Sequence, residues 1–246
     1  QLTQALERAR AGHGQVVAVV GEAGAGKSRL CWEFTHSHRT QDWLLLESSS
    51  VSYGKATPYL PVIDLLKSYF QIEVRDAPRK IREKVMGKLL SLDRALEPWT
   101  PALLWLLGVA PDDASWERLD APHRRERTLD GVKRLLLRES QVQPLLLVFD
   151  DLHWIDSESQ TLLDGLVESS PTARLLLLVT YRPEYRHDWS CKTFYRQLQL
   201  GALPVESADE FLASLLGQDA SLRSLKRLLI ERTDANPFFP LMQQKK

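Results

Sequence analysis

Residues 21–28 constrain this chain more than any other stretch. They read Gly-Glu-Ala-Gly-Ala-Gly-Lys-Ser, after an apolar run at 15–20 and before a helical pattern that begins at Ser28. A strand, a G-x-x-x-x-G-K-S loop and a helix, in that order, are the context of a phosphate-binding loop. Glycines let the backbone adopt conformations closed to other residues and approach an anion closely. The alternative, a glycine-rich turn with a chance lysine, is disfavoured by the flanking strand and helix.

The chemistry of such a loop predicts a role for each of its residues. Its backbone N–H groups converge on phosphate oxygens, helped by the positive end of the following helix. The ammonium of Lys27 is expected on the β- and γ-phosphates, and the hydroxyl of Ser28 is expected to bind Mg²⁺. The sequence therefore predicts that a nucleoside triphosphate is bound by Gly21, Glu22, Ala23, Gly24, Ala25, Gly26, Lys27, Ser28 and Arg29.

Two carboxylates, Asp150 and Asp151, follow the apolar run 145–149. Five consecutive apolar residues are typical of a strand buried on both faces of a parallel sheet. Ligands bind beyond the carboxyl ends of such strands. A turn needs only one aspartate, so the pair favours a Mg²⁺ ligand, Asp150, and a residue that handles water, Asp151. Either Asp156 or Ser157 is expected to cap the next helix, the latter in a capping box.

A further run at 175–179 ends in Thr180-Tyr181-Arg182-Pro183. Pro183 keeps the preceding residue extended rather than helical, which leaves Arg182 at the same edge as the phosphate loop. Arginine suits phosphate recognition because its planar guanidinium matches phosphate oxygens. Arg182 is therefore predicted to sense the γ-phosphate; a structural salt bridge is the alternative.

These runs together predict an α/β fold, a three-layer sandwich with a five-stranded, mainly parallel sheet. The nucleotide-binding domain is expected over residues 1–204. It contains a helical insertion at about 56–140, where apolar residues recur at helical spacing without a convincing strand. Residues 205–246 are expected to begin a helical lid that is truncated here.

Composition limits the classes of partner. With 32 basic and 32 acidic residues, the chain has no basic field for nucleic acid. The basic cluster Arg124, Arg125 and Arg127 is interpreted as a solvated helix face rather than a phosphate or partner site. Two distant cysteines, Cys31 and Cys191, suit the reducing cytoplasm, and Cys31 is expected in the core.

Targeting features are absent from the sequence. No apolar run reaches the ~18 residues of a membrane span, and no signal peptide precedes the first helix. The chain is therefore expected to be cytoplasmic and to have no membrane partner. Neither end has the character of a natural terminus, so a longer parent protein is expected.

Four segments resemble the signal-transduction ATPases with numerous domains, the STAND class of P-loop NTPases. They are 20–30, 144–156, 175–184 and 234–239, and the sequences FDDLHWID, TYRPEY and NPFF carry the likeness. The most similar branch is the bacterial one found in large regulators and beside adenylate/guanylate cyclase domains. In that family His153 and Trp154 belong to the signature, and packing under the strand is at least as good an interpretation of them as chemistry.

The resemblance implies a role for each site residue. Residues 21–28 would be the Walker A loop, Asp150 the Walker B acid that holds Mg²⁺, and Asp151 the group that orients or deprotonates the attacking water. Arg182 would be the sensor-1 residue. Pro237, with the asparagine before it, would belong to the lid motif and lie near the adenine.

The function implied is a Mg²⁺-dependent ATP switch that hydrolyses slowly. ATP would close the lid and hydrolysis would reopen it. An arginine finger, worth ~10³–10⁵ in rate, is not evident, so an isolated domain should be slow. ATP is favoured over GTP because no N-K-x-D motif occurs. Expected partners are other domains of the same chain, such as cyclase, helical-repeat or DNA-binding modules, and other copies in ATP-dependent self-association.

Two alternatives remain open from the sequence. One is a DNA-associated AAA-type loader of the origin-recognition kind, which the neutral net charge disfavours. The other is a non-hydrolysing, nucleotide-gated scaffold in which ATP only stabilises the fold. A small-molecule kinase is disfavoured because the second acid, Asp151, points to water as the acceptor.

Overall fold

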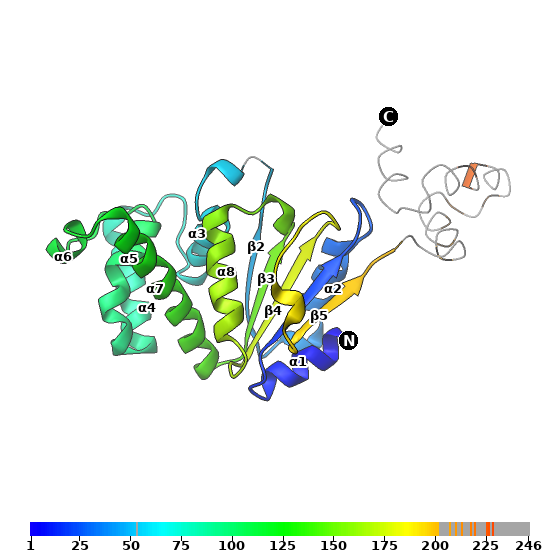
Figure 1. Ribbon diagram of the computed structural model, residues 1–246, viewed down its shortest axis with the longest axis horizontal. Coiled ribbons are helices and arrows are strands. Elements are labelled where there is room, and N and C mark those ends of the chain that lie inside the picture. The colour runs from blue at the N-terminus through cyan, green and yellow to red at the C-terminus, as the bar shows by residue number, and fades with distance from the viewer. Residues whose placement is uncertain are drawn as a thin grey trace.

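A five-stranded parallel sheet forms the centre of the molecule (Figure 1). The computed structural model describes residues 1–52 and 54–201, with Ser207, Glu210, Ala213, Gly217, Asp219, Leu225, Lys226 and Leu228 beyond them. The strand order is β2-β3-β4-β1-β5, and every pairing is parallel. This confirms the predicted α/β fold with a five-stranded sheet. The predicted lid at 205–246 lies outside the described residues apart from those eight, and the domain boundaries stay a prediction.

Helices separate the strands, with α3 to α7 between β2 and β3 and only the short η5 between β4 and β5. The strands are β1 Gln15–Val20, β2 Leu44–Ser49, β3 Leu145–Asp150, β4 Leu175–Tyr181 and β5 Tyr195–Gln199. The α-helices are α1 Leu2–Arg10, α2 Lys27–Thr35, α3 Leu60–Tyr69, α4 Pro78–Leu92, α5 Thr100–Leu106, α6 Ala114–Glu117, α7 Ala121–Val142 and α8 Ser157–Ser169. Short 3-10 helices are η1 His38–Thr40, η2 Gly54–Ala56, η3 Arg94–Trp99, η4 Leu152–Trp154 and η5 Trp189–Cys191.

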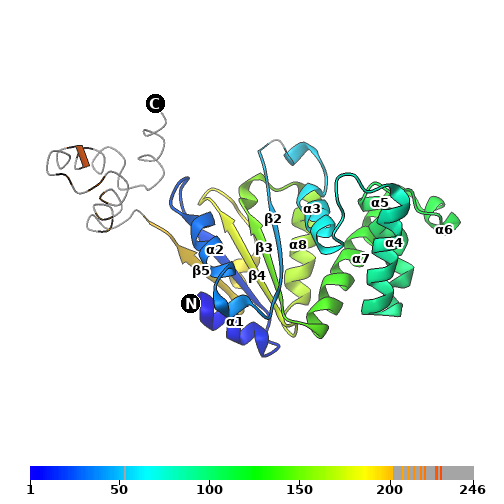
Figure 2. The ribbon, with the colours of Figure 1, turned by 180° about the vertical axis from the view of Figure 1, so that it is seen from behind.

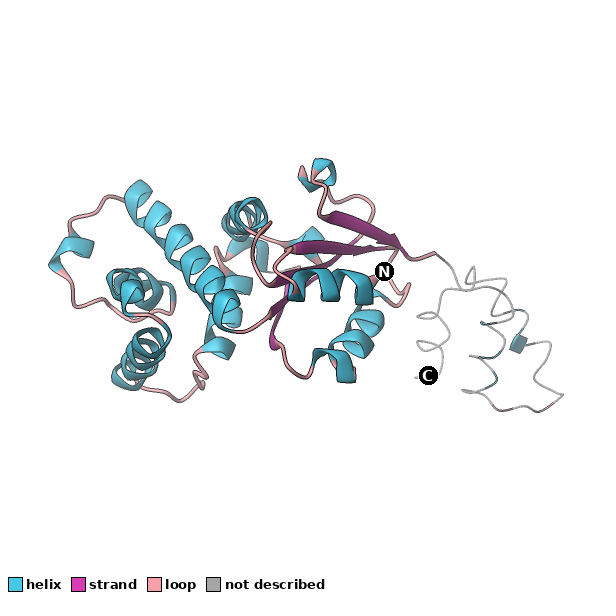
Figure 3. Ribbon diagram, turned by 90° about the horizontal axis from the view of Figure 1, so that it is seen from below, coloured by secondary structure: helices cyan, strands magenta, loops and turns pink. Residues whose placement is uncertain are grey.

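Strand β1 explains the layered architecture. Its side chains alternate between two apolar cores, with Val16, Ala18 and Val20 in one and Val17 and Val19 in the other. A strand that is apolar on both faces needs cover on both. Helices α1 and α2 supply it on one face, and helices including α3, α7 and α8 supply it on the other (Figures 2 and 3). Cys31, on the buried face of α2, lies in the core, as predicted.

The helices predicted between residues 56 and 140 are present as α3 to α7. Helices α4, α5 and α6 lie at the end of the molecule opposite β5 (Figure 1). Helix α7 then returns the chain to the sheet. It begins beside Pro122, with Asp120 accepting the N–H of His123 at its start.

The basic cluster on α7 makes contacts with neighbouring elements. The guanidinium of Arg125 pairs with Glu158 of α8 at 2.5 Å. Arg127 lies over the ring of Trp99 at 5.3 Å. Arg124 donates to a main-chain carbonyl of the segment before α7 at 2.7 Å. The three arginines therefore connect α7 to neighbouring elements while remaining partly exposed, and the choice between a solvated face and a phosphate or partner site stays a prediction.

Candidate functional site

Three loops meet at the carboxyl edge of the sheet. They are the loop between β1 and α2, the turn after β3 and the segment after β4 (Figure 1). The parallel register pairs Val20 with Tyr181 and Phe149 with Val179, so β1, β3 and β4 end together. In an open parallel sheet this is the edge where ligands bind. The residues predicted from distant parts of the sequence thus share one location.

The glycine-rich loop has the backbone that its sequence predicts. Gly24 and Gly26 adopt φ angles of 81° and 89°, in the left-handed region that favours glycine. A Cβ atom at Gly21 would lie 2.8 Å from a main-chain oxygen just after β5. The side chain of Lys27 is buried, and its Nζ donates to the carbonyls of Gly21 at 2.9 Å and Glu22 at 3.0 Å. The ammonium is therefore held inside the curve of the loop.

A hydrogen-bond chain connects this loop to both aspartates. The Ser28 hydroxyl donates to Asp150 Oδ2 at 2.7 Å. The Thr180 hydroxyl donates to the other oxygen of Asp150. It also accepts the backbone N–H of Asp151 at 2.9 Å. Sequence reasoning missed Thr180, whose only signal is a hydroxyl that closes an apolar strand at the predicted edge.

Asp151 has an unusual main chain and a perturbed carboxyl group. Its φ and ψ are 58° and 47°, a left-handed conformation rare outside glycine. Burial, and next the charge of Asp150, raise the pKa of Asp151, while His153, Lys27 and Arg182 act in the opposite direction. Lys27 and Arg182 are therefore close enough to the Asp151 carboxylate for their charges to act on it. The structure therefore brings Lys27, Asp150, Asp151 and Arg182 together.

Arg182 follows β4 directly and is half-buried. Within residues 1–52 and 54–201, no acidic group forms an ion pair with its guanidinium. The alternative of a structural salt bridge therefore has no partner among these residues. Within residues 1–52 and 54–201, the charge of Arg182 is thus not paired with a carboxylate.

The turn after β3 is anchored by Asp156. Its carboxylate accepts the N–H groups of Glu158 at 3.1 Å and Ser159 at 2.9 Å, which caps α8. It also accepts the N–H of Tyr59, from the segment after β2, at 3.0 Å. Asp156 is thus the capping residue, and the predicted capping box at Ser157 is wrong because that residue is already helical.

The residues at this edge fit a magnesium ion and a triphosphate. Mg²⁺ usually binds through one or two carboxylates together with substrate phosphates, rather than in a cage made only of protein groups. Ser28 and Asp150 supply a hydroxyl and a carboxylate in contact. No group of three or more acidic, histidine or cysteine side chains suited to a metal occurs among the described residues. That donor set suits an ion shared with phosphate oxygens.

Several predicted nucleotide contacts have no support from the geometry of the site. The guanidinium of Arg29 pairs with Glu33 and lies 5.1 Å from the centre of the Trp32 ring. A contact from Arg29 to nucleotide stays a prediction, as do those from Glu22, Ala23 and Ala25 in the loop. Pro237 lies outside the described residues.

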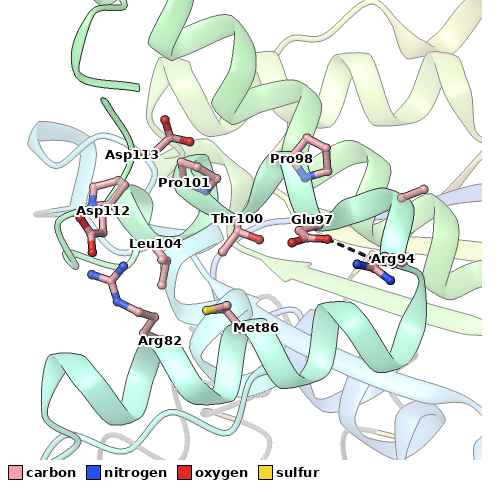
Figure 4. Close-up of a pocket in the computed structure, with 12 residues that line it drawn as sticks. Arg82, Met86, Arg94, Glu97, Pro98, Thr100, Pro101, Leu104, Asp112 and Asp113 are labelled. Atoms are coloured by element: carbon pink, nitrogen blue, oxygen red, sulfur yellow. Dashed lines mark ion pairs between the residues drawn. The ribbon is translucent and has the colours of Figure 1, made fainter. Parts of the chain in front are cut away.

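The helical insertion contains a groove that is separate from the carboxyl edge of the sheet. It has a volume of about 860 Å³ and lies between α4, η3, α5 and the segment after α5 (Figure 4). Arg94 and Glu97 on its wall form an exposed ion pair at 3.6 Å. Its lining contains no glycine-rich loop, and it lies away from the edge that carries Lys27 and Asp150. The nucleotide site is therefore not this groove.

The fold and the loop define the class of protein: a P-loop nucleoside triphosphatase of the α/β type. The comparison with protein families matches residues 1–179 to the AAA ATPase domain. Since this match covers most of the chain, the chain belongs to the AAA ATPase domain family. It confirms the predicted P-loop ATPase class and is consistent with the resemblance to STAND proteins.

The similar proteins described next are longer than this chain. An uncharacterized protein of Rhizobium meliloti (strain 1021) is 26% identical over 184 residues, which are 73% of this chain and 17% of that protein. The chain thus spans about a sixth of that relative. Among solved structures, a STAND protein with a tetratricopeptide repeat sensor from Pyrococcus horikoshii has a TM-score of 0.45 at 12% identity, over 95% of this chain and 28% of that one.

Drosophila ORC bound to DNA is also similar in structure. Its TM-score is 0.39 at 13% identity, over 94% of this chain and 47% of that chain. Among the described residues, no helix is both long enough and apolar enough to cross a membrane.

Proposed function

We propose that this chain is the Mg²⁺-dependent ATP-binding switch domain of a longer signal-transduction or transcription regulator, and that it hydrolyses ATP slowly. The observation that carries the proposal is the contact between Ser28 and Asp150 beside the buried Lys27. A loop hydroxyl and a strand carboxylate are the protein groups that hold Mg²⁺ in P-loop ATPases. Membership of the AAA ATPase domain family and the resemblance to STAND proteins support ATP as the nucleotide.

Lys27 binds the β- and γ-phosphates in this proposal. Its Nζ now donates to two carbonyl oxygens of its own loop. On nucleotide binding these hydrogen bonds are exchanged for bonds to anionic phosphate oxygens, which are stronger because both partners are charged. The preformed position of the ammonium means that little reorganisation accompanies this exchange.

Asp151 orients the attacking water. Its main chain is fixed by the N–H bond to Thr180, while its carboxylate is 41% exposed at the open edge of the sheet. Arg182 contacts the γ-phosphate and responds to its loss. When bound, the magnesium ion supplies positive charge against the charge that develops on the phosphate oxygens. No candidate arginine finger is evident, and its absence from the site costs ~10³–10⁵ in rate.

The switch operates through contacts that one nucleotide state makes and the other lacks. A ligand shifts a conformational equilibrium only by its difference in affinity for the two states. Arg182 and Asp151 are the groups placed to distinguish triphosphate from diphosphate. The moving part is the predicted lid at 205–246, with Pro237 near the adenine. Other domains of the longer cytoplasmic protein, and other copies of it, are the proposed partners.

Two substitutions test this function. Lys27→Ala should abolish ATP binding, measured by titration with a fluorescent ATP analogue, whereas Lys67→Ala, on the exposed side of α3, should bind normally. Asp151→Asn should bind ATP but release phosphate at a small fraction of the wild-type rate, with the exposed Asp42→Asn as its control. Normal binding by Lys27→Ala, or wild-type hydrolysis by Asp151→Asn, would falsify the assigned roles.

The same assays separate the alternatives. Tight ATP binding without phosphate release, even with the rest of the protein present, would support the non-hydrolysing scaffold. Binding to DNA that weakens steeply with salt, with a slope of several phosphates, would support the DNA-associated loader.

A further inference from the structure

His153 is a buried side chain without hydrogen bonds. Its side chain is 6% exposed, and neither ring nitrogen has a hydrogen-bond partner within residues 1–52 and 54–201. A buried polar group left unpaired costs ~1–3 kcal/mol. Such a group in a folded protein calls for an explanation. Packing alone would be served better by an apolar side chain of similar size, so packing does not explain the imidazole.

The charged group nearest to this imidazole is the Asp151 carboxylate. His153 Nδ1 lies 3.7 Å from Asp151 Oδ1. In the part of the chain that the structure describes, no other basic group lies within ion-pair distance of this carboxylate, and it accepts no hydrogen bond. Lys27, Arg182 and Glu184 act on the imidazole at longer range. His153 therefore belongs to the same edge as the proposed catalytic groups.

The main chain around both residues is fixed. The N–H of Asp151 donates to Thr180, and the N–H of Trp154 donates to the carbonyl of Asp151 at 2.9 Å, which closes the 3-10 turn that carries His153. Only the side chains can still adjust. Within residues 1–52 and 54–201, His153 is the basic side chain close enough to orient the Asp151 carboxylate.

We propose that His153 is a positioning residue whose Nδ1–H donates a hydrogen bond to the Asp151 carboxylate when nucleotide is bound, which fixes the oxygen that faces the attacking water. The inference rests on the proposed function. An N–H···O bond measures ~2.9 Å, so the two atoms must approach by somewhat under ~1 Å. Catalytic hydrogen bonds are often long without substrate and tighten in its complex. His153 exchanges no proton with the substrate.

The state of the ring agrees with this role. Burial lowers the pKa of His153, so the imidazole is neutral at pH 7. A neutral imidazole carries one N–H and one acceptor nitrogen. Donation from Nδ1 to a carboxylate therefore leaves Nε2 as the unprotonated acceptor nitrogen.

Three substitutions distinguish the two nitrogens. His153→Asn keeps an N–H at the Nδ1 position, His153→Gln moves it to the Nε2 position, and His153→Leu removes both. Misplacement of a catalytic group by about 1 Å costs ~10²-fold in rate. We expect His153→Leu and His153→Gln to lower kcat by ~10–100-fold with unchanged KM and nucleotide affinity, and His153→Asn to recover most of kcat. The exposed His38→Leu, on η1, is the matched control.

A merely structural histidine predicts a different pattern. His153→Leu would then keep wild-type kcat, and thermal unfolding would occur at the same or a higher temperature. That result overturns the proposal, as does recovery by His153→Gln but not by His153→Asn. If His153→Leu does not fold, the comparison between the two amide variants still decides.

Nitrogen-15 NMR of histidine tests the geometry without turnover. The His153 signal is assigned as the one missing from the spectrum of His153→Asn. With a non-hydrolysable ATP analogue and Mg²⁺ bound, this signal should show an Nδ1–H tautomer whose proton moves downfield. Asp151→Asn should remove that shift. An Nε2–H tautomer, or a shift that persists in Asp151→Asn, overturns the proposal. A failure of the proposed ATPase function would give a different result. The wild-type protein would then bind the analogue and show the NMR shift but release no phosphate from ATP.

Discussion

The hydroxyl of Ser28 lies 2.7 Å from the Asp150 carboxylate, although the two residues are 122 positions apart in the sequence. Ser28 is in the first turn of α2, after β1, and Asp150 ends β3. Strand β4 lies between those two strands in the sheet. The contact therefore depends on the crossover that places β4 beside β1, and it joins the phosphate loop to the proposed metal ligand.

Removal of this hydroxyl should weaken the Mg²⁺-dependent part of ATP binding. Ser28→Ala removes one of the two proposed protein ligands of Mg²⁺, so we expect it to lower ATP affinity by about tenfold in the presence of Mg²⁺, the order of one lost interaction with a charged group (~1.5 kcal/mol). In EDTA the loss should be much smaller. Fluorescence titration under both conditions measures the difference. Ser28→Thr, which keeps the hydroxyl, is the control, and an equal loss in EDTA would contradict a metal role.

Thr180 should contribute to both stability and turnover. It is fully buried, donates to Asp150 and accepts from Asp151. Thr180→Val keeps the shape but leaves both partners unpaired, which costs ~1–3 kcal/mol for each buried group that loses its bond. We expect a lower urea midpoint and slower phosphate release, with Thr180→Ser close to wild type. Equal values for the valine and serine variants would exclude the hydroxyl as the cause.

The sequence was sufficient to predict most of the fold and the main parts of the site. Local spacing fixes a strand, a glycine-rich loop and a helix around Lys27, and an apolar run fixes β3 before Asp150. Parallel strands must share a carboxyl edge, so the convergence of these segments follows from topology alone. Pro61 and Pro122 lie in the first turns of α3 and α7, where proline is tolerated.

Contacts between distant segments could not be predicted in this way. Thr180 has no feature in the sequence that marks it as the link between Asp150 and Asp151. The partners of the α7 arginines lie on α6, α8 and η3. Helical periodicity says nothing about which neighbours a polar face meets. The unpaired state of His153 depends on how the turn after β3 packs, which only the three-dimensional structure reveals.

The two cysteines should differ strongly in reactivity. Burial raises the pKa of Cys31 to about 12, with the charges of Asp150 and Glu47 adding to the effect, whereas Cys191 is exposed. Because the thiolate is the reactive form, a rise of about 3 pKa units slows alkylation ~10³-fold. At pH 8 a thiol reagent should modify Cys191 rapidly and Cys31 only after denaturation. Cys191→Ser should leave no fast thiol; rapid labelling of that variant would contradict the burial of Cys31.

His187 should make stability depend on pH. Its Nδ1 accepts the N–H of Trp189 at 3.1 Å, so its proton is on Nε2, which donates to Tyr181 at 2.8 Å. Burial lowers the pKa of His187, although the charges of Asp164 and Asp188 oppose this. The folded ring therefore stays neutral at pH values where the unfolded ring, with a pKa of ~6.5, already binds a proton.

The sign of the effect follows from this difference. Below pH ~6.5 the unfolded state binds more protons, so the free energy of unfolding falls as pH falls, by at most ~1.4 kcal/mol per pH unit for one group. The decrease ends once pH is below the lowered pKa of the folded ring. His187→Gln keeps a donor near Tyr181 but cannot titrate, so urea unfolding at pH 7.0, 6.0 and 5.0 should show a smaller decrease than wild type. His153, also buried with a lowered pKa, leaves a residual slope in that variant. The exposed His38→Gln is the control and should retain the full wild-type dependence of the unfolding free energy on pH. An equal dependence in His187→Gln would contradict the prediction, because it would show that the folded ring at position 187 titrates as it does in the unfolded chain.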